Sequence, residues 1–476
     1  MIKNDREYRI TKAQAAEFEQ SLLALGAETT SGVHPIIRQA QRDAVQSLLD
    51  ELRSEISDYE ALRDQRRSVI ELSSLDELPR ALIEGRIAAG LTQRELAERL
   101  GVLEQQVQRY EATNYSSASL SRLIEVARAV GVNMREDVFL PHVQVSEQTL
   151  QRRLGEAGID REFVNRILFD EQTNKSDARD ASSVLRAAGA AGRIFGWTPT
   201  EILAGGQPLT HPQAATAAYF KVYAGAQGTR TIVLSALARY VAQLVVRSTP
   251  SLRPQQIPRS ARAFRKLVLA KSGVLSLESI LDVLWDLGVV VVPLATDGGF
   301  HGACWRFGGR NAIVLKQRTA SEARWVHDLL HETHHAGADP ESPEFVMIDG
   351  ESMPVERRKS PEEKRATRFA GDVQLDGRAE ELALECVTAA SKKVEWLKSV
   401  VPQIAATRHV SVGALANYLA WRLEMDNINW WGTADKLQEG EGRPWNVARD
   451  FLVQRLDWTQ LDRVDRQLLT RTLAEE

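Results

Sequence analysis

Residues 92–110 read Thr-Gln-Arg-Glu-Leu-Ala-Glu-Arg-Leu-Gly-Val-Leu-Glu-Gln-Gln-Val-Gln-Arg-Tyr. Thr92 is a good helix N-cap, and Glu95 follows it by three residues, which is the pattern of a capping box. Gly101 stands where a tight turn with positive φ would end that helix. Ala97 is small where a second helix must cross closely. The stretch therefore predicts two short helices joined by a turn.

This pattern resembles the Xre family of helix-turn-helix proteins, the class of the phage repressors and Cro. The matching parts are the Thr-Gln-Arg-Glu-Leu-Ala start, the glycine at the turn and the later Gln-Val-Gln-Arg-Tyr-Glu run, and residues 120–132 match the family's next helix. The resemblance implies that the second helix enters the major groove of DNA. It assigns base contacts to Gln105, Gln106 and Arg109, and it places Gln93 near a phosphate.

The charge of this region limits its affinity for DNA. Residues 79–132 hold seven Arg against six Glu, which leaves a net charge of only +1, and Glu104 is an acid where the family often has a neutral base-reader. Because non-specific affinity rests on neutralising phosphates, we expect modest binding to an operator unless the protein dimerises. The alternative is a helix-turn-helix used for protein contact.

The first 78 residues are expected to be helical. Thr11 can cap a helix that reaches residue 25, and Pro35 can open a longer one that reaches about Val69. We interpret this pair as a helical hairpin used for packing or for forming a homodimer. Residues 1–132 as a unit resemble antitoxins of the HigA type.

Composition excludes several classes of protein. The chain has 476 residues, 43% apolar and 26% charged, with a net charge of −4, which excludes wholesale disorder and gives no charge-based sign of a partner. Its two cysteines, Cys304 and Cys386, exclude a disulfide scaffold. Residues 1–10 lack the apolar core of a signal peptide, and the apolar run 287–295 is too short to cross a bilayer. We expect a cytoplasmic protein without a membrane partner.

The pattern along the chain predicts a mainly α protein with a C-terminal α+β domain. Residues 143–247 are expected to be helical and include a long Ala/Val/Leu-rich segment over 217–246 that Gly225 and Gly228 interrupt, and the Pro-rich stretch 248–258 is typical of a linker. The strands expected after the linker lie at 289–292, 303–307 and 311–315, with Gly308-Gly309 as a hairpin turn between the last two. We expect a helical N-terminal region (1–78), a helix-turn-helix domain (79–142), a helical middle region with a linker (143–258), an α+β domain with a small sheet (259–425) and a helical extension (426–476).

A cluster of histidines indicates a metal site. Four of the nine histidines share one face of the helix predicted over 321–336: His327, His331, His334 and His335. The run from His331 to His335 fits H-E-x-x-H, in which two imidazoles one helical turn apart offer neutral nitrogen donors to zinc. Glu332, between them, can take a proton from water and return it to a leaving amine.

Other assignments within the cluster compete with this one. His327 and His331 flank Asp328 in the same way, but the longer side chain of Glu332 favours the His331–His335 pair. His334 has either a solvent-facing or a supporting role, of which we prefer the first, and His327 either orients a ligand or simply packs.

A third ligand is expected downstream. Pro361 can begin a second helix, on which Glu363 shares a face with Ala366 and Ala370, whose small side chains permit close approach to the first helix. The long acidic loop between His335 and Glu363 would shield the cleft or bind a substrate.

These two helices resemble the ImmA/IrrE family of zinc metallopeptidases. In that family H-E-x-x-H is followed by a helix with E-x-x-A-x-x-F-A, which Glu363, Ala366, Phe369 and Ala370 match, and the likeness covers about residues 277–425. The resemblance implies a zincin-like domain, Zn²⁺ held by His331, His335 and Glu363, and a regulatory protein substrate such as a repressor or antitoxin. The family usually has Gly where this chain has His334.

Three functional hypotheses follow from the two resemblances. The first is a DNA-binding transcription regulator fused to a zinc endopeptidase that cleaves a regulatory protein, with Glu332 as the catalytic base. The second is a fused toxin–antitoxin protein, in which residues 1–132 restrain a toxic hydrolase and repress their own promoter. The third is a transcription factor with a catalytically silent, metal-binding sensor domain.

Overall fold

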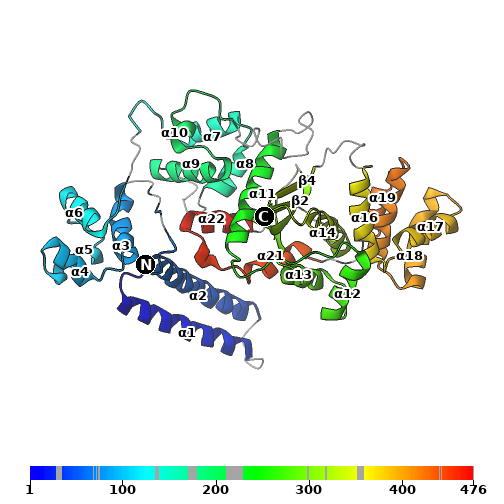
Figure 1. The fold of residues 1–476 in the computed structure, drawn as a ribbon, viewed down its shortest axis with the longest axis horizontal. Helices are drawn as coiled ribbons and strands as arrows, with labels where there is room; N and C mark the ends of the chain where they lie inside the picture. The colour runs from blue at the N-terminus through cyan, green and yellow to red at the C-terminus, as the bar shows by residue number, and fades with distance from the viewer. Residues whose placement is uncertain are drawn as a thin grey trace. The chain divides into compact units, whose positions relative to one another are not determined.

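The computed structural model is mainly helical with one small sheet (Figure 1), which confirms the predicted fold class. The chain divides into two compact units. The first comprises residues 1–147, 175–186 and 457–466, and the second comprises 148–174, 187–456 and 467–476. The structure describes residues 1–27, 35–67, 69–70, 72, 75–134, 139–169, 180–210, 229–296, 300–316, 319–350, 359–438, 440 and 442–474.

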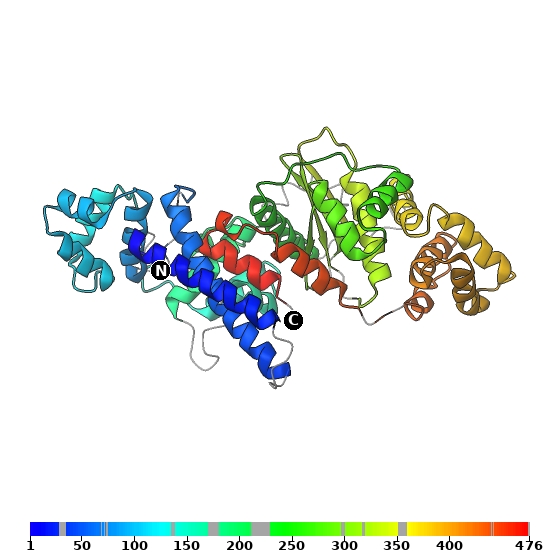
Figure 2. The same ribbon diagram turned by 90° about the horizontal axis from the view of Figure 1, so that it is seen from below.

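The first unit begins with a helical hairpin of α1 (Asp5–Ala27) and α2 (Pro35–Arg63), which lie side by side in both views (Figures 1 and 2). The predicted start at Thr11 is wrong. Asn4 caps the helix instead, because its Oδ1 accepts a hydrogen bond from Glu7 N at 2.9 Å, and the Glu7 carboxylate accepts one from Lys3 N at 2.8 Å. The Asn4 side chain thus satisfies an N–H group of the first helical turn, as an N-cap residue does, while Glu7 reaches back to Lys3.

The second hairpin helix ends before the predicted Val69. Gln65 adopts a φ of 55°, and Arg66 N donates to Ala61 O at 2.9 Å. A left-handed residue that returns the chain onto the last turn ends a helix. The helix therefore ends at Arg63, although its charged pattern continues beyond it.

Four helices form the predicted helix-turn-helix module. The Thr92–Glu95 capping box is present, Gly101 ends the following helix with a φ of 66°, and both features confirm the prediction. Leu82, Leu96 and Val126 are fully buried in a core that the module shares with Ile2, Tyr59 and Leu62 of the N-terminal hairpin region. The elements are η1 (Leu75–Glu77), α3 (Leu78–Ala88), α4 (Gln93–Leu100), α5 (Glu104–Ala112) and α6 (Leu120–Val130).

The middle region is helical as predicted. Of the Ala/Val/Leu-rich segment over 217–246, residues 217–228 lie outside the described residues, and the remainder belongs to α11. The region contains α7 (Glu147–Glu156), α8 (Arg161–Phe163), η2 (Val164–Leu168), α9 (Ala181–Phe195), α10 (Pro199–Leu203) and α11 (Thr229–Arg247).

The stretch 248–258 is not a free linker, which corrects the prediction. Thr249 is buried, and its backbone oxygen accepts a hydrogen bond from the Arg310 guanidinium at 2.7 Å. Ile257 belongs to the core of the second unit. The prolines thus shape an irregular segment that packs onto the sheet, because their spacing prevents a helix but not burial.

The sheet has four strands in the order β1-β3-β2-β4. The strand β1 runs parallel to β3, and the other two pairs are antiparallel. Gly308 and Gly309 have φ values of 55° and 83°, which confirms the tight hairpin between β2 and β3. The strands are β1 (Val290–Pro293), β2 (Phe300–Phe307), β3 (Arg310–Leu315) and β4 (Phe345–Gly350).

The strand β4 lies inside the segment predicted to be an acidic loop, so that prediction is wrong for residues 345–350. Met347 and Ile348 are buried, and Met347 pairs with Cys304 on β2. The acids of the segment concealed the strand because they surround a short apolar run. Residues 351–358, which include Glu351, lie outside the described residues.

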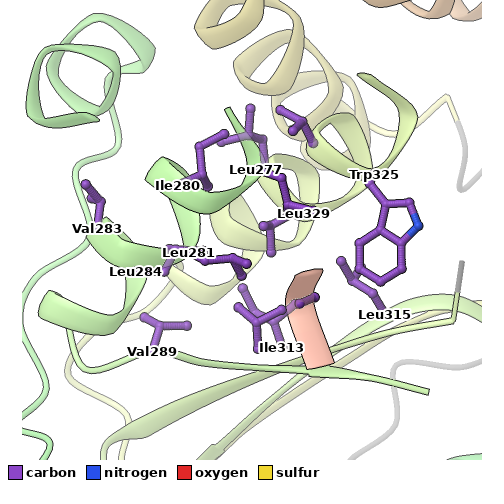
Figure 3. Packing of buried hydrophobic residues seen from close by; sticks show 14 of the residues in the cluster. Leu277, Ile280, Leu281, Val283, Leu284, Val289, Ile313, Leu315, Trp325 and Leu329 are labelled. Carbon is purple, nitrogen blue, oxygen red and sulfur yellow. The ribbon is translucent and has the colours of Figure 1, made fainter. Parts of the chain in front are cut away.

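Helices cover both faces of the sheet (Figure 2). On one face, Leu281, Ile313 and Leu329 belong to a core shared by α13, β3 and α14 (Figure 3). The alternate strand residues, such as Val290 and Val314, are also fully buried, and α11 contacts the first three strands. The core that contains Leu281 and Leu329 is shared by α12 (Ala261–Ser272), α13 (Leu277–Asp286), α14 (Glu322–Ala336) and α16 (Pro361–Gln374).

The remaining helices follow α16. A separate core within residues 375–434 gathers around Leu382, Ile404 and Tyr418, whereas Trp445 and Ala448 belong to the core that covers the sheet. Among the described residues, no helix is both long and apolar enough to cross a membrane. The elements are α17 (Ala379–Ala389), η5 (Val394–Trp396), α18 (Leu397–Arg408), α19 (Val412–Met425), α20 (Trp431–Asp435), α21 (Pro444–Val453), η6 (Trp458–Gln460) and α22 (Arg463–Thr472).

Candidate metal centre and DNA interface

Two capped helices build the candidate metal centre. Ser321 caps α14 by accepting a hydrogen bond from Arg324 N at 3.1 Å, and Ser360 caps α16 by accepting one from Glu363 N at 3.2 Å. The Ser360 cap places Glu363 in the first turn of α16. Ala366 and Ala370 are fully buried, which lets α14 and α16 pack closely as the sequence predicts.

The structure brings His331, His335 and Glu363 together. The Nε2 atoms of the two histidines lie 3.1 Å apart. Glu363 Oε2 lies 3.2 Å from His331 Nε2 and 3.6 Å from His335 Nε2. Among the described residues, these three side chains form the cluster whose ligand atoms are close enough to bind one metal ion. Three donors from two helices thus face a common point.

The surroundings favour an ionised Glu363 and a fixed His331. Burial alone would raise the pKa of the Glu363 carboxyl, but hydrogen bonds to His331 and His335 hold that pKa well below its usual range. Thr367 Oγ1 lies 3.3 Å from His331 Nδ1, so it can fix the imidazole with Nε2 toward the other ligands. Sequence reasoning missed Thr367, although it follows Glu363 by one helical turn.

Glu332 follows the candidate ligand His331 on α14, and its side chain lies against the strand β2. Its side chain is 2% exposed. A Cβ atom added to Gly302, on β2, would collide with the Glu332 carboxyl group. A glycine inside a strand often marks such a close approach. A glycine within a strand at position 302 was the sequence signal that could have predicted this close contact.

The remaining histidines of α14 lie outside the three-ligand group. His327 is buried with its Nδ1 3.4 Å from Gln374 Nε2, and burial lowers its pKa to about 3. Asp328 pairs with Arg324 at 3.4 Å. His334 is half-buried, and its ring lies 5.5 Å from that of Phe369, so it does not simply face solvent as preferred from the sequence.

A buried ion pair organises the helix-turn-helix module. Arg86, 3% exposed, donates to both carboxylate oxygens of Glu111, which is fully buried. Arg86 also donates to Leu91 O at 2.7 Å and Lys3 O at 2.6 Å. Gln93 Nε2 donates to Glu111 Oε2 at 2.8 Å. The side chain of Gln93, expected near a phosphate, is therefore engaged inside the module.

The predicted base-readers differ in how available they are. Gln105 and Arg109 are exposed on α5. Gln106 is half-buried, and its Nε2 donates to Tyr110 Oη at 2.8 Å. Gln105 and Arg109 therefore present their side chains on the surface of α5, whereas the amide group of Gln106 donates a hydrogen bond to another residue of the same helix.

Comparison with known families agrees with this geometry. A helix-turn-helix family model matches residues 82–136. Those residues form a helix-turn-helix DNA-binding domain. No curated protein and no solved structure matches the chain. The helix-turn-helix domain thus accounts for α3 to α6, and the second unit is interpreted from its own residues.

Proposed function

We propose that this protein is a DNA-binding regulator whose second unit is a zinc-dependent endopeptidase. The observation that carries the proposal is the convergence of His331 Nε2, His335 Nε2 and Glu363 Oε2, with Glu332 as the next residue after His331 in the chain. Two imidazoles, one ligating carboxylate and a neighbouring glutamate form the donor and base set of a zinc hydrolase.

The donor atoms fit a zinc ion. At the usual zinc–ligand distances, neighbouring corners of a tetrahedron are about 3.3 Å apart. The three separations of 3.1, 3.2 and 3.6 Å bracket that value. Three protein ligands are also the number that a catalytic zinc site uses, because the fourth position serves water or substrate.

The chemistry divides between the ion and the chain. Zinc bound at this site would lower the pKa of water and polarise the carbonyl group of a peptide bond. Glu332 takes the proton from the attacking water and delivers it to the nitrogen of the leaving amine. Burial of Glu332 against Gly302 strengthens its interaction with nearby charge, because the dielectric constant there is low. Thr367 keeps His331 oriented throughout.

The substrate that we propose is a regulatory protein, such as a repressor or an antitoxin. The support is the presence of a DNA-binding domain in the same chain, together with the resemblance of the 277–425 region to peptidases that cleave such partners. The DNA-binding domain would then direct proteolysis to proteins of the same regulatory circuit.

Metal content and new protein N-termini test this proposal in two steps. The purified wild-type protein is expected to hold one zinc per chain, Glu363→Ala to lose it, and Glu381→Ala, which removes an exposed acid of α17, to keep it. In cells that express the wild-type protein, cleavage of the substrate is expected to create new N-termini on cellular proteins. Cells that express Glu332→Gln should lack these N-termini, although the zinc content of the variant should stay unchanged. A wild-type protein without zinc, or cleavage that survives Glu332→Gln, would disprove the proposal.

A further inference from the structure

We infer that Arg306 is a positioning residue for the metal centre, which it serves by holding the C-terminal end of α14. This inference rests on the proposed function. Arg306 lies on β2 opposite Asn311, and its side chain is 2% exposed. None of its hydrogen bonds is to a proposed ligand side chain.

All five donors of the Arg306 guanidinium are used. Its Nε donates to Asn311 Oδ1 at 2.8 Å. Its two Nη groups donate to four backbone carbonyls among the seven residues after His335: Ala336 at 2.7 Å, Ala338 at 2.9 Å, Ser342 at 3.0 Å, and Asp339. A planar fork of donors suits such a set, which a single ammonium group could not satisfy.

These carbonyls belong to the place where the helix ends and the chain reverses. Ala338 N donates to His335 O at 2.9 Å, and Asp339 takes a φ of 44°. The last carbonyls of a helix have no partner within it and carry the negative end of its dipole. Arg306 supplies both hydrogen bonds to this end of the helix and a positive charge.

The consequence for the metal centre follows from the position of His335. This ligand lies in the last turn of α14, one residue before the first carbonyl that Arg306 holds. Loss of the guanidinium would leave the carbonyl of the buried Ala336 without this partner and would allow the turn to fray. The imidazole of His335 would then lose its fixed place relative to His331 and Glu363, which raises the cost of ordering the ligands around an ion.

A matched control exists on the neighbouring strand. Arg310 of β3 donates to Val246 O at 2.6 Å and to Thr249 O at 2.7 Å, and so holds the end of α11. That helix carries no proposed ligand. Replacing Arg310 therefore removes the same kind of contact from the same unit without touching α14.

The test compares zinc affinity, measured by chelator competition, with thermal stability in the full-length chain. Arg306→Gln is expected to bind zinc at least about tenfold more weakly than wild type, as is typical for lost support of a ligand. Arg310→Gln should bind zinc as wild type does, although both variants melt earlier. Arg306→Lys, which keeps the charge but not the fork, should also weaken binding and carries the test if Arg306→Gln misfolds.

Two outcomes would overturn the inference in distinguishable ways. If wild type binds zinc and the Arg306 variants match Arg310→Gln in affinity, then Arg306 only stabilises the fold and the proposed function stands. If wild type binds no zinc, the proposed function fails and takes this inference with it. The absorption spectrum of the cobalt-loaded protein adds a second readout, because it changes with ligand geometry rather than with stability.

Discussion

The carboxyl group of Glu332 packs against Gly302, a position of β2 where any side chain would collide with it. The contact joins the helix that carries the proposed base to the strand beside it. Gly302 pairs with Leu315 on one side and with Asp349 on the other, so its backbone is held in the sheet from both sides. The strand therefore has little freedom to move away if this space is filled.

Gly302→Ala is predicted to impair catalysis more than metal binding. The added methyl group must displace Glu332, while His331, His335 and Glu363 keep their own supports. We expect a loss of about 1–3 kcal/mol in the free energy of unfolding from overpacking. Zinc content should stay near wild type, and Glu332-dependent cleavage should be lost. Gly432→Ala is the control, because an added Cβ atom at that position has no neighbour within 4 Å. Full activity of Gly302→Ala would argue against Glu332 as the base.

Thr367→Val should weaken zinc binding while preserving the fold. Valine has nearly the shape of threonine but cannot hydrogen-bond to His331 Nδ1. Loss of such a partner typically lowers metal affinity about 10–100-fold, which chelator competition measures. Thr333→Val serves as control, because that buried hydroxyl donates to Leu329 O at 2.7 Å and to no ligand. Equal affinities of the two variants would show that Thr367 does not orient His331.

Breaking the buried pair of the helix-turn-helix domain should destabilise that domain. Arg86→Met leaves Glu111 buried without its cation, which typically costs about 3–5 kcal/mol. Hydrogen exchange measured by mass spectrometry over residues 78–112 is expected to accelerate, with no change over α14. Arg94→Met, which removes an exposed pair with Glu98, should leave exchange unchanged. Slow exchange in Arg86→Met would mean that the pair is not essential to the domain.

Substitutions of the three residues of α5 that are predicted to contact bases should differ in their effect on DNA affinity, because the three side chains differ in exposure. Gln105→Ala and Arg109→Ala each remove an exposed side chain and are expected to cost about 1–3 kcal/mol of specific binding. Gln106→Ala should cost less, because its Nε2 already bonds to Tyr110 Oη. Fluorescence anisotropy with a site selected from random DNA measures all three. A larger loss for Gln106 than for Gln105 would mean that the Tyr110 bond breaks on binding.

Several elements were predictable from local pattern. The Thr92–Glu95 capping box, the Gly308-Gly309 turn and the helix carrying H-E-x-x-H depend on residues within about one helical turn of each other, where geometry follows from spacing alone. Prediction failed where a helix end was set by a less obvious cap, as at Asn4, or where acids surrounded a short strand, as at β4.

The sequence by itself determined that His331 and His335 share a helix face, because four residues make about one turn. It also placed Glu363 on a second helix with small neighbours. Only the tertiary structure decided that Glu363 reaches the histidines, that Gly302 accommodates Glu332 and that Arg306 closes the end of α14. These contacts join residues that are 28 to 36 positions apart, and the distance between such residues depends on how helices and strands pack rather than on the local rules of the backbone.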